Sequence, residues 1–306
     1  MDAAYREEYK GLQDLPAWDI ISESEYNKIK DTVGSILPTM AISTIKSDEN
    51  GVPIRAKYRI VALGNLDPHD WSKSECYAPV MSLFELRLMV SLAARHKRIP
   101  KTGDVKQAFC QAVLPENEKY VLRPPAGCPI TPPKSYWILK RTLYGLKRSP
   151  KHWFIKCKQL LESIDMHQCT NSPCLFKGTL IKGEPPLYLG LYVDDFIYFS
   201  ESDAVERMFE ERFGKMTKVD FMGPATHFLG IKIQHKQYKD GHVDIRLSQE
   251  AFAEQLIQNT NMDGADISTK ASPYSSGHPI DLVKEVQMTE EERAPLIQKM
   301  RSLVGS

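Results

Sequence analysis

The chain has 306 residues, of which 42% are hydrophobic, and a formal net charge of +1 that by itself says little about partners. The N-terminus MDAAYREEYKG lacks an apolar signal segment, and charged residues interrupt every hydrophobic stretch before the about 18 residues needed to span a bilayer, so neither secretion nor membrane insertion is expected. Six cysteines without a CxxC pair predict reduced, intracellular thiols and exclude a disulfide framework.

The first third of the chain alternates between helical and strand-like patterns. Ser22 and Glu25 form a capping box, and Asn50-Gly51 is a strong hairpin turn signal. A Ser82 cap precedes apolar residues at helical spacing. The pattern therefore predicts a helix at about 3–15, a short helix after Ser22, strands at 40–47 and 55–63, and a helix at 82–96.

The remaining chain continues in the same way. The pattern predicts a loop at 124–133, a helix from the Ser-Pro at 149 to about 164, and a strand pair around the turn at 182–186. A helix at 202–213 and short strands around 227–233 and 242–248 are expected next. A helix at 249–261 and a Gly/Ser/Pro-rich linker at 264–279 would follow. Hairpins with intervening helices, without repeating βαβ units, indicate an α+β fold. The sequence contains no internal repeat and no Rossmann or P-loop motif.

One long segment is basic throughout. Between Lys119 and Leu161 there is no Asp or Glu, while Lys and Arg are interleaved with Tyr136, Trp137, Tyr144 and Trp153. A solvated basic face is the simplest interpretation. Cations alternating with aromatic rings are also typical of a groove that follows a phosphate backbone, so nucleic-acid contact is predicted.

Three residues invite a zinc interpretation. His167, Cys169 and Cys174 lie close together in the sequence. Their spacing fits no common zinc site and a fourth ligand is missing, so a zinc centre is not expected.

Residues 190–200 read GLYVDDFIYFS and place Asp194 and Asp195 within an apolar run. The flanking β-branched and aromatic residues are typical of buried strands, where an unpaired carboxylate is costly. A hairpin with its turn at 193–195 resolves the conflict, because the carboxylates then project from the loop tip into a cleft. If the carboxylates bind a metal ion, Asp194 is favoured as the direct ligand, and Asp195 would lie nearby in a supporting position.

A third acid, Asp104, lies far upstream in TGDVKQAF, at the end of a strand-like segment. Alone it is equally well explained as a cap of the next segment. Beside Asp194 it would concentrate negative charge that cations relieve, and hard carboxylate oxygens suit Mg²⁺. Such a site can hold two metal ions about 3.5 to 4 Å apart, the geometry of in-line phosphoryl transfer.

Several motifs then occur in a recognisable order: RAKYRIVALGN, YAPV, GDVKQAF, RTLYGLKRSPKHW, LYVDDFIYFS, HFLGIKI and LSQEAF. With them the sequence resembles the reverse transcriptases of copia-type LTR retrotransposons, from Trp18 to Ser306. YVDD alone is moderately specific, whereas the blocks in register are very specific. The resemblance implies a right-hand polymerase with fingers, a palm of antiparallel sheet plus helices, and a partial thumb.

The resemblance also implies a division of the chain and a set of partners. Residues 1–35 would be an N-terminal helical segment, 36–263 the fingers, palm and start of the thumb, and 264–306 a linker and truncated connection towards ribonuclease H. The implied activity is RNA-directed DNA polymerisation, with an RNA template, a DNA primer, deoxynucleotides and two Mg²⁺ ions, for which Mn²⁺ would substitute.

The resemblance assigns the catalytic residues. Asp104 and Asp194 would bind both metals, the backbone oxygen of Val105 would help, and Asp195 would complete the carboxylate set. Phe109 occupies the steric-gate position, where an aromatic ring excludes a ribose 2′-hydroxyl. Without its fixed offset from Asp104, Phe109 would be interpreted as an ordinary core residue.

Further positions are assigned to nucleotide and nucleic acid. Lys57 and Arg59 would clamp the triphosphate, although paired cations on an exposed hairpin are usually only solubilising. Tyr144 and Gly145 would line the nucleotide pocket, where glycine permits close backbone approach. The residues assigned to template and primer are Lys147, Arg148, Leu229 and Gly230, the last two with Phe228 in a primer grip.

Some features depart from the family pattern. Leu63 stands where many relatives carry Lys, and Phe252 replaces a frequent Tyr. The sequence stops at MRSLVGS, without ribonuclease H, integrase, protease or a zinc knuckle. A polyprotein fragment or truncated genomic copy is therefore expected, intracellular and cytoplasmic, particle-associated in an intact element, with its oligomeric state open.

Two other functions compete with polymerisation. A non-catalytic remnant would fold and bind nucleic acid without extending a primer. A Mg²⁺-dependent nuclease using the same acids would leave Phe109, Lys57 and LYGLKRSP unexplained.

Overall fold

The computed structural model of the chain describes residues 2–33, 36–47, 52–67, 69–126, 128, 130–259, 289 and 293–298. The turn expected at Asn50-Gly51 and the linker expected at 264–279 lie outside these residues. The chain divides into two units, Met1–Phe228 with Gln234–Ile245 and Leu229–Ile233 with Arg246–Ser306. Within the described ranges, every helix falls short of the length and apolar character that crossing a membrane requires.

The first sheet has five strands in the order β1-β6-β5-β2-β3. The strands are β1 (Trp18–Ser22), β6 (Ser135–Leu139), β5 (Val121–Arg123), β2 (Ile36–Ser47) and β3 (Pro53–Ala62). β2 pairs antiparallel with β3 and parallel with β5. Helix α1 (Asp2–Asp14) packs against β3, and Tyr9 and Leu12 join Trp18, Ile60 and Trp137 in a buried core. Helix α2 (Glu23–Val33) follows the capping box, in which Ser22 and Glu25 bond reciprocally.

The second sheet has six strands in the order β11-β4-β10-β9-β8-β7. These strands are β11 (Val219–Pro224), β4 (Lys101–Val105), β10 (Asp195–Ser200), β9 (Leu187–Tyr192), β8 (Ser172–Gly178) and β7 (Met166–Cys169). The longer helices beside it are α4 (Leu83–Arg95), α6 (Ser149–Glu162) and α7 (Asp203–Met216). Three short helical segments complete this part, η1 (Gly64–Leu66), α3 (Lys73–Cys76) and α5 (Ala108–Gln111).

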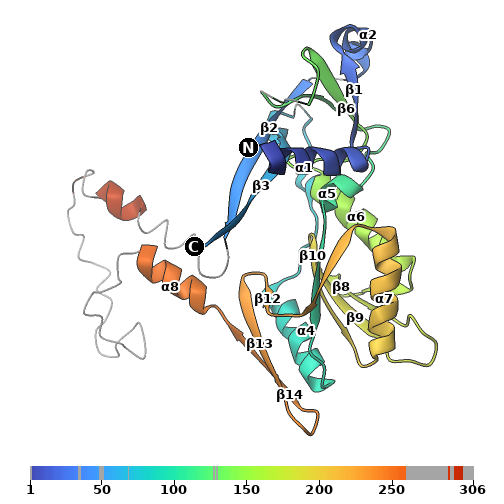
Figure 1. The fold of residues 1–306 in the computed structure, drawn as a ribbon, viewed down its shortest axis with the longest axis vertical. Coiled ribbons are helices and arrows are strands. Elements are labelled where there is room, and N and C mark those ends of the chain that lie inside the picture. The colour runs from blue at the N-terminus through green and yellow to red at the C-terminus, as the bar shows by residue number, and fades with distance from the viewer. Residues whose placement is uncertain are drawn as a thin grey trace. The chain divides into compact units, whose positions relative to one another are not determined.

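Strand β10 is covered on both faces. Figure 1 shows α7 on one side of the sheet and α4 on the other. Phe196 and Tyr198 pack in the cluster formed with α6 and α7, while Phe199 lies next to His96 at the end of α4. Five successive residues of β10, from Phe196 to Ser200, are therefore buried. Burial on both faces explains why this strand is a continuous apolar run and not an alternating one.

A third sheet follows in the order β12-β13-β14. Its strands are β12 (His227–Phe228), β13 (Ile231–Gln237) and β14 (Val243–Ser248), and helix α8 (Glu250–Asn259) comes next. The β13–β14 hairpin is closed by the amide of Tyr238, which donates to the carbonyl of His242 at 2.8 Å.

The α+β class with antiparallel sheets, predicted from the element pattern, is confirmed. The predicted helices appear as α1, α2, α4, α6, α7 and α8, with bounds shifted by a few residues at most. The pattern did not identify β1, β5, β6 and β11, which are short and take their pairing from distant partners, nor the four-residue β7. Of these, β11 matters most because it flanks β4.

Candidate active site

The acidic pair lies at a tight hairpin between β9 and β10. Tyr192 pairs with Asp195, so Val193 and Asp194 alone form the turn. Val193 adopts a φ of +56°, which is unfavourable for a β-branched residue. The predicted hairpin is present, but Asp195 is the first residue of β10 and not part of the turn. Because the backbone of Val193 is in the left-handed conformation, a turn of two residues is enough to connect β9 to β10.

Two neighbouring elements hold this turn in place. The Nε1 of Trp153, on α6, donates to the carbonyl of Val193 at 2.6 Å. The amide of Val105, on β4, donates to the carbonyl of Asp194 at 2.8 Å. Trp153 is almost fully buried, so its hydrogen bond is made away from water. The turn is thus fixed from both sides.

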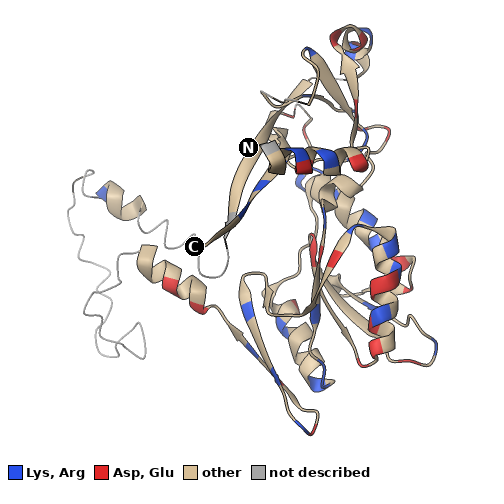
Figure 2. Cartoon of the chain, in the orientation of Figure 1, with Lys and Arg blue, Asp and Glu red and all other residues tan. Residues whose placement is uncertain are grey.

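The register brings the distant acids together. Asp104 on β4 is directly opposite Asp195 on β10 and, on its other side, opposite Asp220 on β11. Directly opposite residues project from the same face of a sheet, so three carboxylates form a row across three strands. Figure 2 shows acidic segments close together near one end of the strands of this sheet. Lys106 pairs with Asp220 at 2.8 Å.

The donor chemistry of this row suits a divalent cation. Asp104, Asp194 and Asp195 are each half-buried, and like charges directly opposite one another destabilise a sheet unless a cation lies between them. The part of the chain that the structure describes nevertheless contains no preformed group of three or more His, Cys, Asp or Glu side chains able to hold a metal. The backbone arrangement is in place, and binding would require the carboxylates to converge.

The predicted gate residue lies just beyond β4. Gln107 takes a left-handed φ of +50° and precedes α5, which carries Phe109. The hydroxyl of Thr142 donates to the carbonyl of Phe109. The Phe109 ring is half-buried and lies 5.7 Å, centroid to centroid, from that of Tyr144. The structure thus brings these two predicted pocket residues together.

Tyr144 also meets the strand that carries the predicted triphosphate clamp. The guanidinium carbon of Arg59 lies 5.7 Å from the centroid of the Tyr144 ring. Burial raises the pKa of the Tyr144 hydroxyl, with a further contribution from Asp194, so the phenol stays neutral. Arg59 and Lys57 project from the same side of β3, since they are two residues apart. Arg59 is exposed and Lys57 is half-buried.

Gly145 permits a close approach of two chain segments. It has a φ of +90°, and a Cβ there would lie 2.0 Å from the carbonyl oxygen of Ala62. The amide of Ala62 donates to the carbonyl of Tyr144 at 2.8 Å. The positive φ and the close approach of the Ala62 carbonyl oxygen each require a glycine at position 145.

The two cations assigned to template differ in their surroundings. Lys147 is exposed, and its Nζ lies 3.4 Å from the carbonyl oxygen of Asp67. Arg148 instead forms an ion pair with the buried Glu118, and its guanidinium stacks 4.5 Å from the ring centroid of Trp71. Arg148 is therefore engaged within the fold, whereas the Lys147 side chain is exposed.

The residues assigned to the primer grip form another turn. Leu229 and Gly230 have φ values of +53° and +71° and connect β12 to β13. Consecutive positive φ values are typical of a two-residue hairpin turn, which explains a glycine at the second position. They belong to the second unit of the chain, whereas the buried Phe228 belongs to the first.

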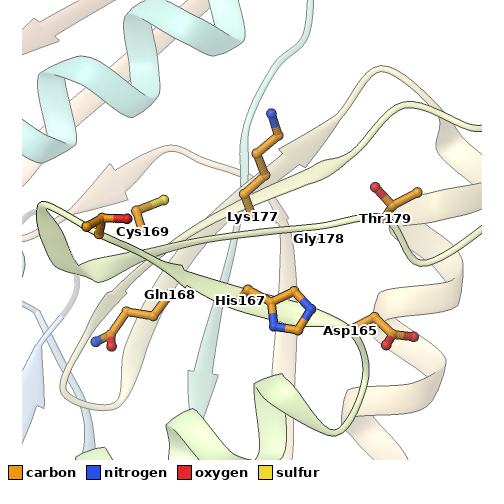
Figure 3. A pocket seen from close by; sticks show the side chains of 8 residues that line it. Asp165, His167, Gln168, Cys169, Lys177, Gly178 and Thr179 are labelled. Carbon is orange, nitrogen blue, oxygen red and sulfur yellow. The ribbon is translucent and has the colours of Figure 1, made fainter.

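The zinc alternative finds no support. His167 and Cys169 line an open hollow of about 530 Å³ along the β7–β8 hairpin, together with Asp165 and Lys177. In Figure 3 the His167 ring and the Cys169 thiol do not point toward one another. Cys174 is buried and does not line the hollow. This hollow is at the far edge of the sheet from the acidic row.

Comparison with known proteins identifies the family. Residues 26–275 match the family described as reverse transcriptase (RNA-dependent DNA polymerase). This match covers most of the chain, which therefore belongs to the reverse transcriptase family. The resemblance to copia-type retrotransposon enzymes is also confirmed, because the curated relatives are transposon Pol polyproteins.

The relatives are much longer than this chain. The retrovirus-related Pol polyprotein from transposon TNT 1-94 of Nicotiana tabacum is 27% identical over 265 residues, which cover 86% of this chain and 19% of the relative. That from transposon RE1 of Arabidopsis thaliana is 25% identical, covering 87% and 17%. The transposon Ty1-NL2 Gag-Pol polyprotein of Saccharomyces cerevisiae is 25% identical, covering 99% and 16%. The chain thus spans less than a fifth of these relatives.

Among solved structures, the foamy viral protease-reverse transcriptase dRH in complex with double-stranded DNA is similar at 16% identity. The similarity has a TM-score of 0.42 and covers 88% of this chain and 37% of that chain.

Sequence reasoning missed two residues that shape the site. Trp153 was noted only as an aromatic residue in a basic segment, yet it holds the aspartate turn. Asp220 was not considered, yet it extends the acidic row. The apolar–polar–apolar order of Val219, Asp220 and Phe221 was the available signal for β11.

Proposed function

We propose that this chain is the RNA-directed DNA polymerase domain of a retrotransposon, adding deoxynucleotides to a primer 3′-hydroxyl along an RNA template. The observation that carries the proposal is the register that sets Asp104 opposite Asp195, with Asp194 in the adjoining turn. Membership of the reverse transcriptase family supports the reaction class.

Asp104 and Asp195 of the acidic row, with Asp194 in the adjoining turn, would hold the divalent cations that the family generally uses. Asp104 and Asp194, with the backbone carbonyl of Val105, are the proposed ligands, and Asp195 completes the set. Two bound Mg²⁺ ions, or Mn²⁺ in their place, would lower the pKa of the primer hydroxyl and stabilise charge on the leaving pyrophosphate.

The surrounding side chains would bind and select the nucleotide. Lys57 and Arg59 would neutralise the triphosphate. Phe109 would pack against the deoxyribose, so that a 2′-hydroxyl finds no room, while Tyr144 supports the Phe109 ring. Gly145 would let the backbone approach the nucleotide closely.

The template and primer contacts are proposed for fewer residues than the sequence suggested. Lys147 would meet a template phosphate, and Leu229 with Gly230 would contact the primer. Arg148 is left out because its guanidinium is engaged by Glu118 and Trp71.

The wider organisation is proposed from the relatives. Residues 36–263 would form the fingers, the palm and the start of the thumb, and a connection would follow at 264–306. The segment 1–35, expected to be helical, also contains strand β1 between α1 and α2. Ribonuclease H and integrase would be supplied by other parts of a Pol polyprotein, and the domain would act inside the cell, in the cytoplasm or in a particle.

Primer extension on an RNA template tests the function. The purified chain should extend a DNA primer with deoxynucleotides and Mg²⁺, and chelation with EDTA should stop the reaction. The double variant Asp104→Ala, Asp194→Ala should lose at least about a thousandfold in rate, since it lacks the proposed metal ligands. Extension that survives this double variant would rule out the mechanism.

The sugar preference provides a second readout. Phe109→Ala should raise incorporation of ribonucleotides relative to deoxynucleotides, because room opens for the 2′-hydroxyl. Binding of a primed template without any extension would instead favour the non-catalytic remnant. Degradation of labelled template without added nucleotides would favour the nuclease.

A further inference from the structure

Helix α1 lies outside the residues that match the family, which begin at residue 26, yet it packs against β3. The rings of Tyr5 on α1 and Tyr58 on β3 meet edge to face, with centroids 6.0 Å apart. Tyr58 stands between Lys57 and Arg59, the proposed triphosphate clamp. The N-terminal helix is therefore adjacent to a strand of the proposed nucleotide site.

One acid of α1 faces this region from inside the fold. The Oε2 of Glu8 accepts a hydrogen bond from Nε2 of Gln107 at 3.3 Å. Its Oε1 is buried and has no hydrogen-bond partner among the described residues. Burial raises the pKa of Glu8, while the Gln107 hydrogen bond and the charges of Lys57 and Arg59 act in the opposite direction.

Gln107 links Glu8 to the gate. It takes a φ of +50° and precedes α5, the short helix that carries Phe109. Its amide fits against α1 because residue 11 is glycine: a Cβ on Gly11 would lie 2.7 Å from Nε2 of Gln107. A residue in this strained conformation needs contacts that hold it, and α1 supplies them.

We propose that Glu8 is a positioning residue of the nucleotide site, aligning Gln107 at the start of the helix that carries Phe109. The inference rests on the proposed function and names a contribution from α1, outside the matched residues. Glu8 acts through Gln107 and does not itself contact substrate.

Kinetic analysis of Glu8→Ala tests the proposal. The KM for deoxynucleotide should rise about tenfold, the effect of losing one charge-assisted hydrogen bond. The kcat and the Kd for primer–template should each change by less than about twofold, since the acidic row is untouched. Glu8→Gln, which keeps a hydrogen-bond acceptor but loses the charge, should give an intermediate KM. The matched control is Glu7→Ala, the exposed neighbour on the same helix, which should leave KM unchanged.

Gly11→Ala separates positioning from simple stabilisation of the fold. The new methyl displaces the flexible end of Gln107 from Glu8 and leaves the charge of Glu8 in place. Alanine also favours the helix by about 1 kcal/mol relative to glycine. If Glu8 acts by positioning Gln107, Gly11→Ala should raise the KM although its Tm equals or exceeds that of wild type. A Tm gain with unchanged KM would show that α1 serves stability alone and would overturn the proposal.

Nucleotide binding without turnover distinguishes a failure of the proposed polymerase function from a failure of the proposed role of Glu8. A fluorescent deoxynucleotide can be titrated onto the full chain with primer–template and Ca²⁺ in place of Mg²⁺. Wild-type binding without extension in Mg²⁺ would overturn the polymerase function but retain the nucleotide site, and Glu8→Ala should then bind about tenfold more weakly. Equal affinity of wild type and Glu8→Ala, or no binding by wild type, would overturn the role of Glu8.

Discussion

Trp153 connects helix α6 to the aspartate turn through one hydrogen bond, from its indole Nε1 to the carbonyl of Val193. Val193 has a positive φ, and such strained conformations persist only where the surroundings impose them. The indole therefore supports the geometry of Asp194 and Asp195 through the backbone of Val193.

Replacing this donor should destabilise the fold. Trp153→Phe leaves the Val193 carbonyl, in a half-buried turn, without this partner, and the free energy of unfolding should fall by about 1–3 kcal/mol beyond the cost of the smaller ring. Urea unfolding of Trp153→Phe and Trp137→Phe measures the difference. Trp137 is a suitable control because it is equally buried and its Nε1 has no hydrogen-bond partner among the described residues. Equal losses in the two variants would contradict this role for Trp153.

Asp67 is a second residue with a large local effect. Its buried carboxylate accepts hydrogen bonds from the backbone amide of His69, the indole of Trp71 and the hydroxyl of Tyr120. Burial raises the pKa of Asp67, but the hydrogen bonds from His69 and Trp71 outweigh burial, so the net shift is downward. A depressed carboxyl pKa contributes stability at pH values above the unfolded-state pKa, and that contribution is lost as the pH falls through the folded-state pKa.

The acid dependence of stability should therefore change in Asp67→Asn. The variant should be less stable than wild type at pH 7, and the difference should shrink as the pH falls below about 4, where Asp67 begins to be protonated in the unfolded chain. Urea unfolding at a series of pH values checks this, with Asp70→Asn as the exposed control. A difference that is the same at pH 3 and pH 7 would show that the carboxylate charge is unimportant.

At the scale of elements, the end of β3 and the turn after Leu143 lie so close together that a side chain at the contact would clash with backbone atoms. A Cβ on Gly64 would lie 2.1 Å from the carbonyl oxygen of Gly145, and a Cβ on Gly145 would lie 2.0 Å from that of Ala62. Two glycines therefore let the end of β3 bond to the backbone of Tyr144. This contact joins the strand of the proposed clamp to the proposed nucleotide pocket.

Two alanine substitutions test the contact. Gly183→Ala is the control, because Gly183 has a φ of +87°, close to the +90° of Gly145, but has nothing within 4 Å of its Cβ position. The control should lose about 1–2 kcal/mol of unfolding free energy from backbone strain alone. Gly145→Ala adds a clash with backbone and should lose at least about 2 kcal/mol more. Similar losses, measured by urea unfolding, would show that the segments can separate freely.

For the whole molecule, acids outside the basic segment between Lys119 and Leu161 pair with some of its cations. Lys140 pairs with Asp19 at 2.7 Å, and Arg148 pairs with Glu118. The positive charge available to a nucleic acid is therefore smaller than the sequence of this segment suggests.

Salt dependence of binding distinguishes free from neutralised cations. Lys147→Ala should reduce the slope of log K against log salt concentration by about one for a primer–template duplex, since it removes one proposed phosphate contact. Lys140→Ala should leave the slope unchanged, because Asp19 already occupies that cation. Filter binding between low and moderate salt measures both slopes. An equal decrease in the two variants would show that pairing within the fold does not decide which cations meet nucleic acid.

The sequence by itself determined the family, the α+β class, most helices and the hairpin at Asp194. These features depend on caps, turns and periodicity within a few residues, and on motifs in a fixed order. The register that places Asp104 between Asp195 and Asp220 was decided only by the tertiary structure, as were the bond from Trp153 to Val193 and the internal pairing of Arg148. Each joins segments far apart in the chain, and such contacts form only where packed layers bring them together, so no local pattern encodes them.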